Sequence, residues 1–162
     1  MFEWLGSTSW SVALHESRYV FLVVLMIHVL TVSVFVGMAV MIDLRLLGRT
    51  IVHVPASQVV SCLLPWSRAG FVVMLVTGML LFYAAPLARY ENVFFRLKML
   101  AVALAVINIW VFRRTAYRRV GEWDVDPVPP RGVRIAAAIS LLLLAIIITA
   151  GRMMAYQAYW FG

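Results

Sequence analysis

Four long apolar segments dominate the pattern of hydrophobic and polar positions along the chain. They cover residues 19–42, 69–86, 93–112 and 133–156. A helix that crosses a bilayer needs about 20 mostly apolar residues, because the hydrocarbon core is about 30 Å thick and each residue rises about 1.5 Å. The pattern therefore predicts an all-α protein, an integral membrane four-helix transmembrane bundle that forms a single membrane domain over residues 1–162.

The segments between these runs predict how the bundle is oriented. Residues 43–68 and 113–132 carry most of the arginine, and residues 87–92 form a short turn. Because basic loops stay in the cytoplasm, both termini are expected outside. Residues 3–17 are too short and too polar to span, and their tryptophan and leucine side chains predict a short interfacial segment at the outer surface.

Composition supports a membrane protein and removes other classes. The chain is 64% hydrophobic and 13% charged, whereas soluble domains carry about 25% charged residues. The net charge of +7 resides in short loops between apolar runs, which indicates headgroup contact and excludes a nucleic-acid-binding face. Cys62 is the only cysteine, so the chain has no intrachain disulfide and no cysteine-based metal site.

Three ionisable residues at membrane depth are the candidates for chemistry. His28, Lys98 and Arg152 lie in three different apolar segments, and the predicted topology places all three in the outer half of the bilayer. Tyr156 follows Arg152 by four residues and shares its helix face. Such residues usually face a bundle interior or a polar cavity, since their exposure to lipid is unfavourable.

Two stripes of small and polar residues are expected to point inward. Each repeats at helical spacing, as close helix packing in membranes requires. The stripe on the third segment contains Lys98, Ala101, Ala105, Asn108 and Phe112. The stripe on the fourth contains Ala138, Ala145, Thr149, Arg152 and Tyr156.

These residues suit several kinds of site. A buried neutral histidine is a good axial ligand for haem iron, so His28 is the candidate metal ligand. Lys98 would be the opposite ligand or a propionate partner, and Arg152 a propionate partner. The alternatives are a histidine that only joins helices, with basic side chains that extend to the interface. Nine methionines add a copper hypothesis, although methionine also fills gaps in ordinary packing.

Two other features complete the candidate list. His15 lies on the same side as His28 and would cover a site there, whereas His53 falls on the opposite side. A second polar cluster at the cytoplasmic boundary is expected to fix helix ends at the headgroups, with a quinone or anion site as the alternative. Its members are Asp43, Arg45, Arg68, Asn108 and Arg113.

Several motifs resemble known membrane families. The run from His28 to Gly37, the Val76-Thr-Gly step, and Lys98 ahead of Asn108 resemble the CopD-type copper-resistance proteins. They are also similar to the HemJ-type protoporphyrinogen oxidases, whose first-helix histidine and third-helix lysine are associated with haem b. The runs Asp43-Leu-Arg-Leu-Leu-Gly48 and Gly151-Arg-Met-Met-Ala-Tyr156 look closer still to a bacterial four-helix family of unknown function.

The leading hypothesis is a haem b protein of the bacterial inner membrane, active in electron transfer or porphyrin redox chemistry. Its cofactor-binding residues would be His28, Lys98, Arg152 and Tyr156, and no catalytic residue is assigned. A CopD-type copper-handling protein and a non-catalytic membrane subunit are the alternatives. The expected partners are the lipid bilayer, a redox partner or membrane complex, and further copies of the chain, but not nucleic acid.

Overall fold

The computed structural model describes residues 18–84 and 90–156. Four long helices account for most of this part of the chain: α3 (Arg18–Leu46), α4 (Ala56–Ala84), α6 (Val93–Arg114) and α8 (Arg131–Met153). Three short elements accompany them: η1 (Tyr117–Arg119), α7 (Val120–Trp123) and η2 (Met154–Tyr156). No strand occurs in the described ranges. The predicted interfacial segment at residues 3–17 lies outside them.

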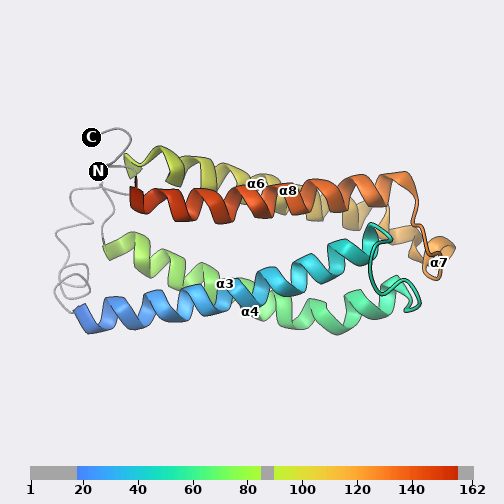
Figure 1. Cartoon of the computed structure of the whole chain (residues 1–162), viewed down its shortest axis with the longest axis horizontal. Coiled ribbons are helices and arrows are strands. Elements are labelled where there is room, and N and C mark those ends of the chain that lie inside the picture. The colour runs from blue at the N-terminus through green and yellow to red at the C-terminus, as the bar shows by residue number, and fades with distance from the viewer. Residues whose placement is uncertain (1–17, 85–89, 157–162) are drawn as a thin grey trace.

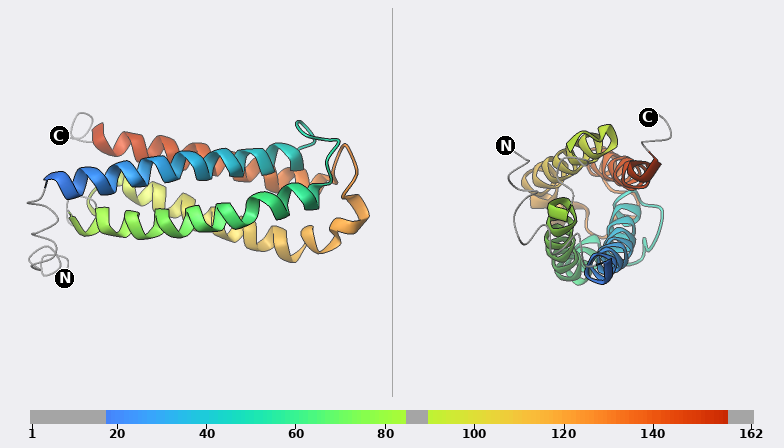
Figure 2. Two further views of the ribbon diagram at one scale, coloured as in Figure 1. Left: turned by 90° about the horizontal axis from the view of Figure 1, so that it is seen from below. Right: turned by 90° about the vertical axis from the view of Figure 1, so that its left-hand side faces the viewer.

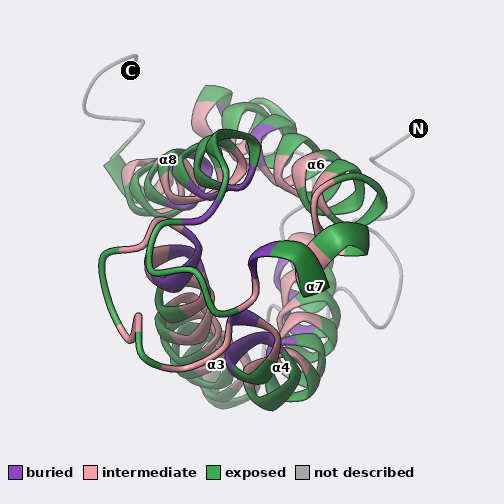
Figure 3. Cartoon of the chain, turned by 90° about the vertical axis from the view of Figure 1, so that its right-hand side faces the viewer, coloured by how far each residue is buried: buried purple, intermediate pink, exposed green. Residues whose placement is uncertain are grey.

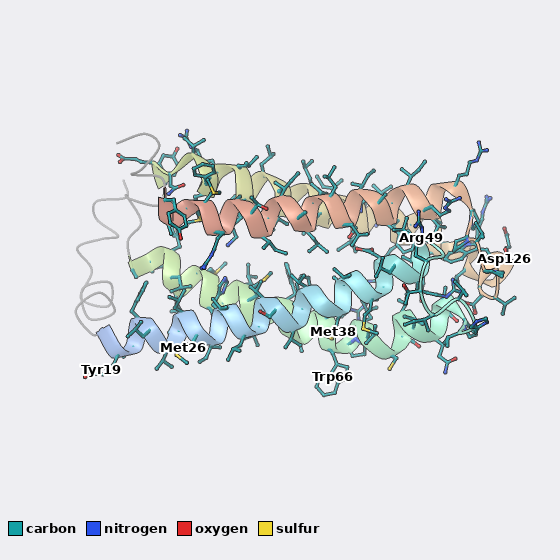
Figure 4. The ribbon with its side chains drawn as sticks, in the orientation of Figure 1. Tyr19, Met26, Met38, Arg49, Trp66 and Asp126 are labelled. Carbon is teal, nitrogen blue, oxygen red and sulfur yellow. The ribbon has the colours of Figure 1, made fainter. Side chains whose placement is uncertain are left out.

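Each long helix belongs to a segment that is long and apolar enough to cross a membrane. These spans are Tyr19–Leu46, Ala56–Ala84, Val93–Trp123 and Arg131–Tyr156. Most of their large apolar side chains face outward; Trp66, for example, is 70% exposed and stands clear of its helix in Figure 4. An outward apolar surface of this kind is what lipid-facing helices require. The predicted all-α, four-helix membrane-spanning fold is confirmed.

The second span begins earlier than predicted. Residues 43–68 were expected to connect two helices, but α3 continues to Leu46 and α4 already begins at Ala56. Pro65 lies inside α4, and membrane helices tolerate proline because neighbouring groups satisfy the freed carbonyl. Gln58, Ser61 and Arg68 are exposed on the first half of α4. These outward polar side chains lowered the apparent hydropathy of a segment that is helical throughout.

The four helices form two antiparallel pairs arranged in a ring. α3 packs most closely on α4 and α6 on α8, while α3 and α8 make the main contact between the pairs. Figure 1 shows the start of α3 and the end of α8 at one end and the short α7 at the other, and the end-on view in Figure 2 shows the ring. The two arginine-rich connections therefore meet at the α7 end.

A cluster of buried apolar residues, the apolar core, lies at the α7 end. Its buried members come from α3, α4, α7 and α8, and they are Leu46, Ala56, Trp123, Val133 and Ala137. Figure 3 looks onto this end and shows the buried stretches turned toward the middle of the ring. Gly48 has a φ of 72°, and a Cβ there would lie 2.7 Å from the Pro127 carbonyl oxygen. Glycine thus lets the turn after α3 touch the segment before α8.

Candidate cofactor site

His28 is joined to the neighbouring helix by a hydrogen bond. Its Nδ1 lies 2.8 Å from Oγ1 of Thr77, so the contact links α3 to α4. Thr77 is buried and His28 is half-buried. The histidine therefore has a defined position between two helices.

The partners of Thr77 fix the tautomer of the neutral imidazole. Thr77 Oγ1 also lies 2.7 Å from the carbonyl oxygen of Val73, and a carbonyl only accepts hydrogen bonds. Since a hydroxyl carries a single proton, it donates to Val73 and accepts from the Nδ1–H of His28. The lone pair of His28 then resides on Nε2, which is the atom through which a histidine held in this way binds a metal.

Because Gly78 has no side chain, the His28 ring can pack against the backbone of α4. A Cβ at Gly78 would lie 3.4 Å from Cε1 of His28 and 4.0 Å from Nδ1. The ring therefore lies directly over the backbone of the residue after Thr77. A methyl group there would be in ordinary van der Waals contact with the imidazole.

Lys98 occupies a comparable place in the other helix pair. Its Nζ would lie 3.8 Å from a Cβ at Gly151, so the lysine of α6 lies along the backbone of α8. Its side chain is half-buried. Ala101 is buried, and Ala105, Asn108 and Phe112 are half-buried on the same face. The inward direction predicted for this stripe is confirmed.

The prediction that the α8 stripe faces inward is wrong. Ala138, Ala145, Thr149 and Arg152 are exposed, and Tyr156 in η2 is 51% exposed. The inward face is instead made by Val133, Ala137, Leu144 and Gly151. Alanine occupies three successive positions at 136–138, so residue size did not distinguish the two registers. Arg152 and Tyr156 therefore lie on the outward side of the helix whose inward side holds Lys98.

His28 and Lys98 lie in the same half of the bundle, as predicted. His28 lies roughly 15 Å along α3 from Arg18, and Lys98 roughly 8 Å along α6 from Val93. In Figure 1 α3 extends beyond α6 at the end opposite α7. The two side chains are consequently at similar depth on opposite helix pairs. His53 lies in the connection at the opposite end, and His15 falls outside the described residues.

Other potential metal ligands do not gather around His28. Within residues 18–84 and 90–156, no three histidine, cysteine, aspartate or glutamate side chains come together. Met26, Met79 and Met99 are exposed by 63%, 58% and 48% on the outer surface. These three methionines therefore form part of the exposed apolar surface of the helices.

A polar network joins the two helix pairs at the α7 end. Arg45 is fully buried, and its Nε donates to the Val54 carbonyl at 2.8 Å. Its Nη2 donates to the Asp124 carbonyl at 3.1 Å. Arg49 and Asp126 mark this end in Figure 4. One side chain of α3 thus contacts both connections, and its partners are backbone carbonyls of those connections.

Asp124 caps the first turn of α4 from a distant segment. Its two carboxylate oxygens accept from the backbone N–H of Ser57 at 2.6 Å and from the Ser57 hydroxyl at 2.7 Å. These two bonds hold the pKa of Asp124 below its usual range, and the bond from the Ser57 backbone N–H has the larger effect. Thr77, Asp124 and Ser57 received no role from the sequence alone, because their partners lie far away along the chain.

Comparison with known proteins places the chain in a family. The matching family model covers residues 2–157. No curated protein and no solved structure matches the chain. The likeness to the CopD-type and HemJ-type proteins thus stays a prediction. Because the match covers nearly the whole sequence, the chain belongs to the Family of unknown function (DUF6644).

Proposed function

We propose that the protein is a haem b-binding electron-transfer protein of the bacterial inner membrane, with His28 as an axial ligand. The observation that carries this proposal is the hydrogen bond between His28 Nδ1 and Thr77 Oγ1. A metal-binding histidine almost always donates its other ring N–H to a nearby acceptor, which fixes the tautomer and the ring orientation. Thr77 supplies that acceptor from the adjacent helix.

The surroundings of His28 are compatible with a flat, largely apolar cofactor. Gly78 leaves the backbone of α4 bare beside the imidazole, and His28 itself is only half-buried. Lys98 would contribute a positive charge for a propionate from the other helix pair. Arg152 and Tyr156 are less suited to contact the same group, since their side chains are exposed.

When bound, haem would supply a one-electron couple between ferric and ferrous iron. The chain's own part is to orient His28 through Thr77 and to keep its Nε2 lone pair directed away from that bond. Copper is the weaker candidate, because Met26, Met79 and Met99 are exposed on three different helices. A soft Cu(I) site needs several sulfur or imidazole ligands at one point.

Absorption spectra of the purified protein test the proposal. Wild type is expected to show a Soret band that shifts and sharpens on reduction with dithionite. The His28→Ala variant is expected to lose the band, while His53→Ala, an exposed histidine at the other end, retains it. A wild-type protein without a Soret band, or an unchanged band in His28→Ala, contradicts the proposal and leaves the His28–Thr77 pair as a helix-packing contact.

The orientation in the membrane is part of the same proposal. The α7 end carries exposed arginines from both connections and from the adjoining helix ends, namely Arg49, Arg113, Arg114, Arg118, Arg119, Arg131 and Arg134. Under the positive-inside rule this end faces the cytoplasm. His28 and Lys98 would then lie in the periplasmic half, with both termini in the periplasm.

A further inference from the structure

A buried carboxyl lies in the other half of the bundle, far from His28. Asp43 is 7% exposed and belongs to the last turns of α3, inside the segment that crosses the membrane. By helical rise it is roughly 22 Å from His28. Acidic residues at such positions are rare, and they usually have a functional reason.

No cation neutralises this carboxyl within the described ranges. Arg45 is the nearest basic residue in the sequence, but its N–H groups donate to the carbonyls of Val54, Asp124 and Asp126. On the neighbouring helices, Arg68, Arg113 and Arg134 have exposed side chains. An ionised Asp43 would therefore be a buried charge without a counter-ion, which is strongly unfavourable.

The polar contacts of Asp43 are few. The Ser140 hydroxyl of α8 hydrogen-bonds the carboxyl, whereas Oδ2 has no hydrogen-bond partner among the described residues. A carboxylate would need several donors to offset its lost hydration. One hydroxyl and one unsatisfied oxygen suit a neutral carboxyl much better.

We propose that Asp43 is a proton-binding site in the membrane-spanning part of the chain, with the proton on the carboxyl oxygen that lacks a protein partner. Ser140 donates to the other oxygen and holds the group in place. Asp43 lies less than one helical turn from the end of α3 at Leu46. Protons therefore enter and leave from the arginine-rich end, and the inference stands independently of haem binding.

A proton fits this position better than a metal cation. A hard cation requires six or more oxygen ligands, or retains its own waters. Around Asp43 the described side chains provide the carboxyl itself and one serine hydroxyl. The carbonyls of Val54 and Asp124, at the same end of the bundle, already accept from the Arg45 guanidinium.

Infrared spectroscopy of the full chain in lipid nanodiscs tests the site across a pH series. Wild type is expected to show the C=O band of a protonated carboxyl at neutral pH, with a shift in D2O. Asp43→Asn should lack this band, and Asp126→Asn, a change at an exposed carboxylate, should retain it. Asp43→Glu keeps a carboxyl and should move the band, which covers the case in which Asp43→Asn fails to fold.

Three results would overturn the proposal. The first is the absence of a protonated-carboxyl band at neutral pH in wild type. The second is the same band, unmoved, in both Asp43→Asn and Asp43→Glu. The third is loss of the band on addition of sodium or potassium at constant pH, which would assign Asp43 to a metal cation instead.

Discussion

At the scale of single residues, Thr77 is the clearest determinant of how His28 is presented. Thr77→Val removes the hydroxyl that accepts the imidazole N–H, whereas Thr77→Ser retains it. Loss of such an orienting partner typically weakens metal binding by about 10- to 100-fold. We expect this loss for valine and near wild-type binding for serine, measured by haem titration. Equal affinities for the two variants would show that the hydroxyl does not orient the ligand.

The Gly78 backbone sets the space beside the same ring. A Cβ would lie 3.4 Å from His28 Cε1, so Gly78→Ala is expected to fold and bind as wild type does. Gly78→Val adds methyl groups that overlap the imidazole and is expected to displace it. The Soret band of the two variants reports the difference. A valine variant with the wild-type spectrum would mean that His28 is not confined by α4.

Asp124 is expected to stabilise the start of α4. Asp124→Ala removes the acceptor for two Ser57 donors, and loss of a helix cap of this type costs about 1 kcal/mol. Thermal unfolding in detergent measures the change. Asp126→Ala is the matched control, because that carboxylate is exposed at the same end. An equal loss in both variants would point to the general charge of this segment and not to the cap.

The Asp124 contribution should also depend on pH. The Ser57 hydrogen bonds lower the pKa of Asp124 in the folded protein. Its stabilisation is therefore present above the unfolded-state pKa of about 3.9 and is lost as the pH falls through the lower folded-state pKa. The difference in stability between wild type and Asp124→Asn is expected to be constant near neutrality and to vanish in acid. A difference that grows in acid would contradict this assignment.

At the scale of elements, the helices themselves were predictable, but their faces and ends were not. Length and hydropathy were sufficient to identify four spans. The first turns of α4 were not predicted, because Pro65 and outward polar residues lower the hydropathy of this segment. The inward face of α8 was predicted wrongly, because three successive alanines do not indicate which of them is buried. The partnership of His28 with Thr77 requires the antiparallel alignment of α3 and α4, which a single sequence does not specify. The inward face of α6 was predictable because Ala101 and Ala105 share the stripe of Lys98, whereas Ala103 alone is small on the next face.

Arg45 is expected to hold the two helix pairs together at the α7 end. Its guanidinium donates to carbonyls in both connections, and lysine has no planar fork with which to replace these bonds. Charged hydrogen bonds of this kind contribute up to about 3 kcal/mol each. Arg45→Lys should therefore lower the unfolding temperature in detergent and make residues 47–55 more sensitive to protease. Arg49→Lys, at an exposed position, should do neither.

At the scale of the whole molecule, the bundle has two chemically different ends. One is closed by the apolar core, Arg45 and Asp124, and the other holds His28 and Lys98. With Cys62→Ser as background, Arg49→Cys should react with an impermeant maleimide from the cytoplasmic side, and Glu91→Cys from the periplasmic side. Both positions are exposed. The reverse pattern would invert the proposed topology.

The metal content of the purified wild-type protein tests the central claim most directly. If His28 is a haem ligand, the iron content of the sample rises in proportion to the amount of polypeptide, and extraction yields haem b. The His28→Ala variant, purified in parallel, contains neither. Copper in place of iron, or no metal in protein extracted gently from membranes of haem-sufficient cells, would contradict the proposal that this family member is a haem protein.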